Sequence, residues 1–383
     1  MIMTLRRTLM SPIGRIIKDL APTPENLRNS EGAFIRMKDG RIAFVWSRYR
    51  DGRHDGDTSD LAVMFSSDEG ESWSEPRVIA RCEEWGAVNI MSPSLLHLND
   101  GRIAVLYLKL VAGLQVLPFM RTTIDFESFS EELDCAHTPG YFCVANDRMR
   151  RLKSGRIIFP GGRSPIGEAE LAQGDHENAD NIVMSQDATV RFYFSDDDGA
   201  SFREAKNELR MPHEIFRTQG EKGLNEPGLI ELDNGAIYAY CRNASGRQYE
   251  SYSYDGGDTW TTPAPSRFTS PTSPMSTLRL SDGRILVGYN PEPLYFGKPI
   301  RANGMWTGGR TSYVLELTDG NLSRLAEPRV MEKDDNSGFG YSAMTETNDA
   351  SVLVAYCAGD STKGDQNMLC RLRIRKIALS ELE

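Results

Sequence analysis

A carboxylate and a guanidinium stand at the ends of two neighbouring apolar runs in the sequence. Glu226 comes just before the run at residues 229–232, and Arg242 ends the run that follows. The Asn234-Gly235 pair between the runs is typical of a tight hairpin, because both residues accept the positive φ angles that such a turn requires. A hairpin brings Glu226 and Arg242 to the same end of a strand pair. There the carboxylate can exchange protons and the guanidinium can bind an anionic group.

A second group of reactive side chains lies in the segment Arg53-His54-Asp55-Gly56-Asp57. Imidazole and carboxylate groups this close together are compatible with a metal site, but the segment is short and has no distant partner at ligand spacing. The remaining histidines form no pair at metal-binding spacing either: His97, His137, His176 and His213. The sequence therefore predicts a polar loop here, with no metal site and no cofactor.

The composition limits the partners that the sequence predicts. The 383 residues carry a formal net charge of −10, and the sequence pI is about 5.2. Duplex nucleic acid and anionic membranes bind through clustered Lys and Arg, so neither is expected as a partner. No apolar run is long enough to span a bilayer, and the N-terminal segment has no signal-peptide pattern. A cytoplasmic protein is expected unless a leader has been removed. The oligomeric state is not predicted.

The cysteines are scattered and form no CxxC pair. In a chain of this length they are predicted to be buried free thiols rather than a disulfide framework or a zinc site. The six are Cys82, Cys135, Cys143, Cys241, Cys357 and Cys370.

The elements that must position the reactive residues are short strands joined by a recurring hairpin. A polar residue, then Asp, Asn or Ser, then Gly precede an apolar strand; the copies reach Gly40, Gly101, Gly155, Gly235 and Gly283, and a degraded sixth reaches Ala350. Six such hairpins predict an all-β fold, a six-bladed β-propeller with four strands in each blade. No linker divides the chain. Residues 1–383 are therefore predicted to form one domain, with a short N-terminal extension at 1–25.

A second repeat, Ser-x-Asp-x-Gly-x-Ser/Thr followed by an aromatic residue, lies within the first. It starts at Ser66 and Ser253, which lead to Trp73 and Trp260, and a weaker copy starts at Ser195. Asp and Ser or Thr can bond the backbone of their own loop, and Gly can take the strained angle. We interpret these segments, called Asp boxes below, as turns on the outer rim.

Two further segments carry predictions about the fold. Residues 368–377 alternate apolar and basic side chains, and we expect them to pair with a strand near the N-terminus and close the ring. Residues 162–188 are long, polar and irregular, and are predicted to be an inserted loop.

With these motifs the chain resembles the sialidase (neuraminidase) superfamily of Asp-box, or BNR-repeat, proteins. The resemblance runs from about Asn29 to Tyr356 and is strongest around Asn225-Glu226-Pro227-Gly228 and Cys241-Arg242-Asn243. It implies that Glu226 and Arg242 face a central pit. It also implies that Tyr341, in Gly338-Phe339-Gly340-Tyr341-Ser342, is a nucleophile, and that Arg310 binds the substrate. The loop around residue 55 then supplies the acid/base residue, with Asp55 favoured and Asp57 second. Arg148 is a further candidate for the lining of the pit.

The resemblance implies a retaining exo-α-sialidase-like glycoside hydrolase, acting on an oligosaccharide or glycoconjugate. Sialic acid carries a carboxylate on its anomeric carbon, so a neutral phenol is a better nucleophile than a second carboxylate. Glu226 would accept the proton of Tyr341. Asp55 would protonate the leaving oxygen and later activate water. Arginines would bind the substrate carboxylate through paired hydrogen bonds.

One position departs from the pattern of the family. Sialidases open the first blade with an Arg-Ile-Pro motif, and alignment on the Asp39-Gly40 turn places it at Ser30-Glu31-Gly32, without arginine. A bulge could shift Arg28 into the pit, another arginine could replace it (Arg48, Arg50 or Arg148), or the substrate differs. Glu31 would repel an anionic sugar but would accept hydrogen bonds from a neutral one. Two other functions therefore stay open: hydrolysis of a different sugar, neutral or acidic, and carbohydrate binding without catalysis.

Overall fold

The structure is a computed structural model that describes residues 11–173, 187–212, 222–294 and 299–383. Within these residues nearly all regular structure is β, which confirms the predicted all-β class. The helical elements are α2 (Glu168–Gln173) and short 3-10 helices at Glu83–Trp85, Ser361–Lys363 and Leu379–Glu381. No helix in the described ranges is both long and apolar enough for a membrane span.

Three four-stranded sheets follow a simple up-and-down order, in which each strand pairs with the next one in its sheet. One contains β2 (Arg28–Arg36), β3 (Ile42–Tyr49), β4 (Ser59–Ser66) and β5 (Arg77–Ala80). Another contains β16 (Asn225–Glu231), β17 (Ile237–Arg242), β18 (Arg247–Ser253) and β19 (Ala264–Thr269). The third contains β20 (Ser276–Arg279), β21 (Ile285–Tyr289), β24 (Ser312–Thr318) and β25 (Arg329–Lys333).

The last four-stranded sheet joins the two ends of the chain. Its order is β1 (Arg15–Leu20), β28 (Leu372–Ala378), β27 (Ser351–Asp360) and β26 (Ser337–Glu346). β1 runs antiparallel to β28, with Arg15 opposite Lys376. This confirms the predicted pairing between the C-terminal run and a strand near the N-terminus. Part of the predicted N-terminal extension is therefore a strand of this sheet.

A ten-stranded sheet departs from the expectation of separate four-stranded units. Its main path contains β6 (Asn89–His97), β7 (Ile103–Ala112), β8 (Gln115–Thr123), β10 (Tyr141–Cys143), β12 (Ile157–Ser164), β13 (Asp187–Ser195) and β14 (Arg203–Glu204). β9 (Leu133–Asp134), β11 (Arg150–Arg151) and β15 (Lys222–Gly223) pair beside it. β10 joins the two halves, because it runs parallel to β8 and antiparallel to β12. A separate two-stranded sheet contains β22 (Arg301–Ala302) and β23 (Met305–Trp306).

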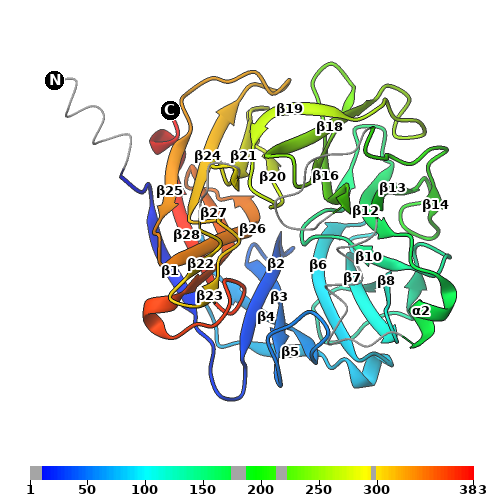
Figure 1. Ribbon diagram of the computed structural model, residues 1–383, viewed down its shortest axis with the longest axis horizontal. Helices are drawn as coiled ribbons and strands as arrows, with labels where there is room; N and C mark the ends of the chain where they lie inside the picture. The colour runs from blue at the N-terminus through cyan, green and yellow to red at the C-terminus, as the bar shows by residue number, and fades with distance from the viewer. Residues whose placement is uncertain (1–10, 174–186, 213–221, 295–298) are drawn as a thin grey trace.

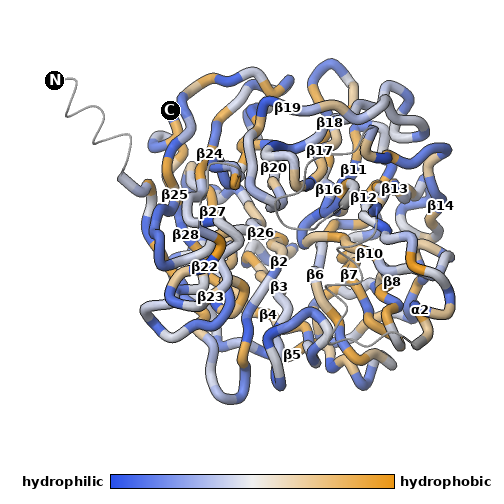
Figure 2. The backbone as a smooth tube through the Cα atoms, viewed as in Figure 1, coloured by the Kyte–Doolittle hydropathy of each residue, from blue (hydrophilic) through white to orange (hydrophobic). Residues whose placement is uncertain are grey.

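The sheets surround a common centre, with β2, β6, β16, β20 and β26 nearest to it (Figure 1). β26 lies against both β2 and β20, so the last sheet also contacts the first. Hydrophobic clusters fill the spaces between neighbouring sheets; Val45, Val63 and Val105, for example, share one. Figure 2 shows the corresponding hydrophobic stretches along the strands. Burying alternate apolar side chains between sheets holds the central strands in place.

The Asp boxes are structural turns, as predicted. In the box after β18, Asp255 accepts hydrogen bonds from the backbone N–H and hydroxyl of Thr259 at 2.9 and 2.6 Å. The indole of Trp260 donates to the carbonyl of Gly257 and stacks on Phe192 with ring centroids 3.7 Å apart. The box after β4 repeats these bonds. These side chains stabilise the link between the third and fourth strands of a sheet.

The predicted inserted loop at residues 162–188 is wrong at both of its ends. Gly162 to Ser164 complete β12, α2 follows, and β13 begins at Asp187. The end of β12 contains polar and glycine residues, so it lacks the alternating apolar pattern that predicts a strand. It is a strand because its backbone pairs with β10 on one side and β13 on the other. Residues 174–186 lie outside the described residues.

Candidate active site

Glu226 and Tyr341 occupy the same kind of position on two central strands. Glu226 lies in a bulge of β16, where the register shifts between Asn225 and Gly228, and Tyr341 lies in a bulge of β26. Both residues have left-handed backbones, with φ values of 39° and 56°. Such angles are costly for residues other than glycine and are concentrated at functional sites. The bulges turn both side chains toward the centre.

Tyr341, Glu226 and Arg242 form one hydrogen-bonded group. The phenol of Tyr341 donates to Oε1 of Glu226 at 2.7 Å. Arg242, from the end of β17, donates to Oε2 of the same carboxylate at 2.6 Å and to the Tyr341 hydroxyl at 3.1 Å. The hairpin between β16 and β17 therefore brings Glu226 and Arg242 together. Tyr341, 115 positions after Glu226, completes the group.

The surroundings of Tyr341 keep its phenol neutral at rest. Burial raises the pKa of Tyr341 well above its ordinary value, and the nearby Glu226 raises it further, whereas Arg242 and Arg310 act in the opposite direction. The ring packs in an apolar cluster with Ala145 and Met368. The phenol therefore cannot ionise in advance, and any reaction at its oxygen needs a base to accept the proton as bonding begins.

Arg310 and Arg148 are both buried, and neither lines the pocket. The Arg310 guanidinium lies 5.4 Å from the centre of the Tyr341 ring and donates to the carbonyl of Thr272 at 2.6 Å. Arg148 donates to the carbonyl of Met275 at 2.8 Å. The structure thus places Arg310 next to the nucleophile candidate, while Arg148 bonds to the backbone behind the pocket.

Asp55 is held by an arginine that approaches from β2. Arg28, which is only 1% exposed, donates to Oδ1 of Asp55 at 2.6 Å and to Oε1 of Glu31 at 3.3 Å. Asn89 holds the loop itself through the carbonyls of Asp55 and Asp57. The carboxylate of Asp57 accepts from the backbone N–H of His54 at 2.7 Å. Asp55 therefore lines the pocket, and Asp57 stabilises the turn.

The bulge of β2 lies where the family has its Arg-Ile-Pro motif. β2 is bulged between Ser30 and Gly32, and the bulged residue is Glu31, with φ of 48°. Arg28 does reach this region, but its donors are used by Asp55 and Glu31. Arg50, another candidate, pairs instead with Asp60 and Glu83.

Glu31 is a buried carboxyl group with an altered pKa. Burial raises the pKa of Glu31 to about 7, against the opposing effect of Arg28; Asp55 and Glu226 raise it further. The hydroxyl of Ser92, from β6, donates to its Oε2. Near neutral pH this carboxyl can therefore either donate or accept a hydrogen bond.

The pocket at the centre combines acidic and apolar walls. Its acidic members are Glu31, Asp55 and Glu226, and Tyr341 lies among them. The other lining residues are Met91, Ser92, Leu108, Tyr141, Phe142, Cys143, Val144 and Ala145. The segment at 141–145 was not predicted, because it reaches the pocket through β10, the strand that joins two halves of a sheet.

A positional signal in the sequence could have located Glu31 and Ser92. Glu31, Ser92, Glu226 and Tyr341 all have positive φ in a bulge of a central strand. Each precedes the glycine of its hairpin, or Ala350 in the last copy, by nine residues. Alignment of the hairpin repeats on that glycine therefore selects four residues of the pocket at once.

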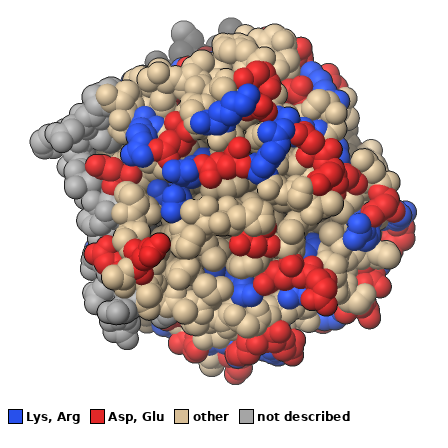
Figure 3. All heavy atoms as spheres, turned by 90° about the vertical axis from the view of Figure 1, so that its right-hand side faces the viewer, with Lys and Arg blue, Asp and Glu red and all other residues tan. Residues whose placement is uncertain are grey.

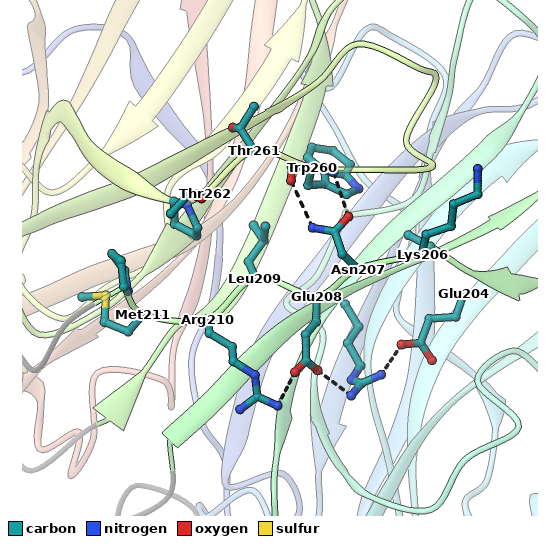
Figure 4. A pocket seen from close by; sticks show the side chains of 14 residues that line it. Glu204, Lys206, Asn207, Glu208, Leu209, Arg210, Met211, Trp260, Thr261 and Thr262 are labelled. Atoms are coloured by element: carbon teal, nitrogen blue, oxygen red, sulfur yellow. Dashed lines mark hydrogen bonds and ion pairs between the residues drawn. The ribbon is translucent and has the colours of Figure 1, made fainter.

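A second pocket lies on the rim and is less suited to chemistry (Figure 4). Its charged groups pair with one another: Arg191 lies between Glu204 and Glu208, which also pairs with Arg210. Asn207 exchanges two hydrogen bonds with the backbone of Trp260. Basic and acidic side chains are interspersed on the face shown in Figure 3 as well. The polar groups of this rim pocket thus serve the structure.

The pKa of Glu31 predicts how stability varies with pH. The folded protein holds the Glu31 proton up to about pH 7, whereas an unfolded chain releases it near pH 4.5. The free energy of unfolding that this proton contributes is fully present below pH 4.5 and is lost as pH rises through 7. Relative to Glu31→Gln, which has no such proton, the wild type is expected to lose up to about 3 kcal/mol over this interval. Urea unfolding of both proteins at pH 4 to 8.5 checks this. A difference that is constant with pH would contradict it.

The ring of sheets, the rim Asp boxes and the central tyrosine–glutamate–arginine group together define the class of sialidase-like proteins. A family model described as a BNR repeat-like domain matches residues 49–354, and the chain belongs to this family. No curated protein matches the sequence.

Solved structures share the fold at low sequence identity. A protein of unknown function from Dyadobacter fermentans is 19% identical, with a TM-score of 0.69, over 96% of this chain and 100% of that one. A K499G mutant of NanB sialidase from Streptococcus pneumoniae is 14% identical, with a TM-score of 0.66, over 97% and 71%. An intramolecular trans-sialidase from Ruminococcus gnavus is 13% identical, with a TM-score of 0.64, over 96% and 98%. These similarities show the fold.

Proposed function

We propose that the protein is a retaining glycoside hydrolase that removes a terminal sugar, with Tyr341 as nucleophile, Glu226 as its base and Asp55 as acid/base. The single observation that carries this is the 2.7 Å hydrogen bond from the Tyr341 hydroxyl to Glu226. A neutral phenol with an adjacent carboxylate is the arrangement that an activated tyrosine needs. A pocket among the central strands can receive the end of a glycan chain.

In the first step the Tyr341 oxygen bonds to the anomeric carbon and the bond to the leaving oxygen breaks. The phenol proton moves to Glu226, and a proton from Asp55 moves to the leaving oxygen. Arg242 contacts both the Glu226 carboxylate and the Tyr341 oxygen, so it holds the pair in line for the transfer. The product is a glycosyl-tyrosine and a free alcohol.

In the second step water replaces the tyrosine. Asp55, now ionised, accepts a proton from the water as its oxygen bonds to the anomeric carbon. The bond to Tyr341 breaks, and Glu226 returns the proton to the phenol. The sugar leaves with its original anomeric configuration, because two displacements have taken place.

The same proposal covers the architecture. We infer six blades in one domain: the ten-stranded sheet counts as two blades that β10 joins. The solved relatives support a glycan as the ligand, since two of them are a sialidase and a trans-sialidase. Sialosides are therefore the first charged substrates to test, although the acidic wall of the pocket favours a different class of sugar.

The direct test is hydrolysis of a panel of aryl glycosides, including an α-sialoside. Glu226→Gln is expected to lower kcat by about 100-fold or more, because the phenol then has no base. Glu332→Gln is the matched control, since Glu332 also accepts a hydrogen bond from a buried tyrosine, Tyr356, but away from the pocket. Equal activity of Glu226→Gln and wild type, or no cleavage of any glycoside by the wild type, would overturn the proposal.

A further inference from the structure

The carboxyl groups of the pocket lining have no cationic neighbour among the residues described in that lining. Among the described residues that line it, the charged ones are Glu31, Asp55 and Glu226, and none is Lys or Arg. A carboxylate on the substrate would be placed among carboxyl groups. Like charges at such short range repel one another. An anionic sugar is therefore disfavoured in this pocket.

The nearby arginines balance the charge of these carboxyl groups, but none of them lines the pocket. Arg28 is covered, and its two terminal nitrogens donate to Asp55, Glu31, Ser30 and the carbonyl of Arg53. Arg242 contacts Glu226 and Tyr341, and Arg310 donates to a backbone carbonyl. Each of these guanidinium groups is thus buried and bonded to at least one protein group.

Glu31 is arranged to meet a hydroxyl group. It is 7% exposed, and it lines the pocket together with Tyr341 and Glu226. Its contact with Arg28 is long at 3.3 Å, and each carboxyl oxygen can take part in more than one hydrogen bond. The left-handed bulge and the bond from Ser92 fix its direction, so its position is set before a ligand arrives.

The apolar wall completes a site for a sugar without charge. Met91, Leu108, Phe142 and Val144 lie around the same pocket. Sugar rings present C–H groups on their faces and hydroxyls at their edges, so they suit a site with apolar walls and a few fixed polar groups. A negatively charged substituent would be unfavourable against the apolar wall and against the carboxyl groups.

We propose that Glu31 selects an uncharged terminal sugar by exchanging a hydrogen bond with one of its hydroxyl groups. This inference rests on the glycosidase function proposed above and names its class of substrate. Glu31 directly follows Ser30, the position at which the Arg-Ile-Pro motif has its arginine. Its role is recognition of the sugar, and Tyr341, Glu226 and Asp55 keep the roles given to them.

The test compares matched aryl glycosides of uncharged hexoses, pentoses and deoxyhexoses with an α-sialoside and uronides. The wild type is expected to cleave an uncharged glycoside at least about 100-fold more efficiently, in kcat/KM, than any charged one. Glu31→Gln is expected to lower kcat/KM for that glycoside by about 10- to 100-fold. The loss is expected to be much smaller with the monodeoxy analogue that lacks the contacted hydroxyl. Glu250→Gln, on β18 and outside the pocket, is the control and is expected to match the wild type.

The outcomes separate this inference from the hydrolase proposal. Preferred cleavage of the sialoside or a uronide, or unchanged kcat/KM in Glu31→Gln, overturns the role of Glu31 and leaves the hydrolase standing. If no glycoside is cleaved, the hydrolase proposal is overturned. Calorimetry with free sugars then tests whether Glu31 recognises an uncharged sugar. Binding of an uncharged sugar that Glu31→Gln weakens then supports the inference, whereas tighter binding of sialic acid, or no binding at all, overturns it.

Discussion

Tyr341→Phe is expected to lower kcat by at least about 1,000-fold while leaving the fold intact. The substitution removes one oxygen atom, the one that donates to Glu226 at 2.7 Å and that would bond to the anomeric carbon. Its ring still fills the apolar cluster around Ala145 and Met368. The measurement is steady-state hydrolysis of the best substrate, together with urea unfolding of both proteins.

The chain provides a close control for this variant. Tyr356 is also buried, and it donates to Glu332 at 2.5 Å while Arg375 contacts both. Tyr356→Phe therefore removes the same atom from the same kind of tyrosine–glutamate–arginine group, but away from the pocket. It is expected to keep the activity of the wild type. Equal losses in the two variants would mean that the effect of Tyr341→Phe is structural.

Arg28→Met is expected to lower the free energy of unfolding by about 3 to 5 kcal/mol. Arg28 is 1% exposed and lies between Glu31 and Asp55, so its loss leaves a buried carboxyl without its cationic partner. Arg28 lowers the pKa of Glu31, so without it Glu31 takes up a proton more readily, which relieves part of the cost. The loss is therefore expected to be larger at pH 8 than at pH 6. Urea unfolding at both values measures it.

Arg41→Met serves as the surface counterpart. Arg41 pairs with Asp39 at 2.8 Å, but both side chains are about half exposed. Loss of such a pair is expected to cost less than about 1 kcal/mol. A similar small cost for Arg28→Met, or a cost that does not depend on pH, would contradict the role given to Arg28.

The turns of the fold could be predicted because their chemistry is local. The Asp39-Gly40 turn depends on the positive φ angle of Gly40, and Asp255 bonds to Thr259 in its own loop. Each of these features involves only a few consecutive residues. The last strand pair could be predicted from alternation in residues 368–377. In contrast, β10 is only three residues long, and its partners on β8 and β12 decide its role. The local sequence does not predict a strand this short.

The candidate site was predicted in part for the same reason. Glu226 and Arg242 belong to one hairpin, so their proximity follows from a single turn. The partnership of Asp55 with Arg28 could not be predicted, because it depends on the bulge that places Glu31, rather than an arginine, in the pocket. A bulge shifts every side chain beyond it, and its presence depends on the packing of the neighbouring sheets.

The pairing of β1 with β28 has a consequence for synthesis on the ribosome. Arg15 is among the first described residues to be made, and its partner Lys376 is among the last. While translation proceeds, the earliest strand has no neighbour to bond with, and its amide groups stay available to other chains. Completion of this sheet must therefore wait until β28 has been made, and a chain that stops before Leu372 leaves β1 without its partner strand.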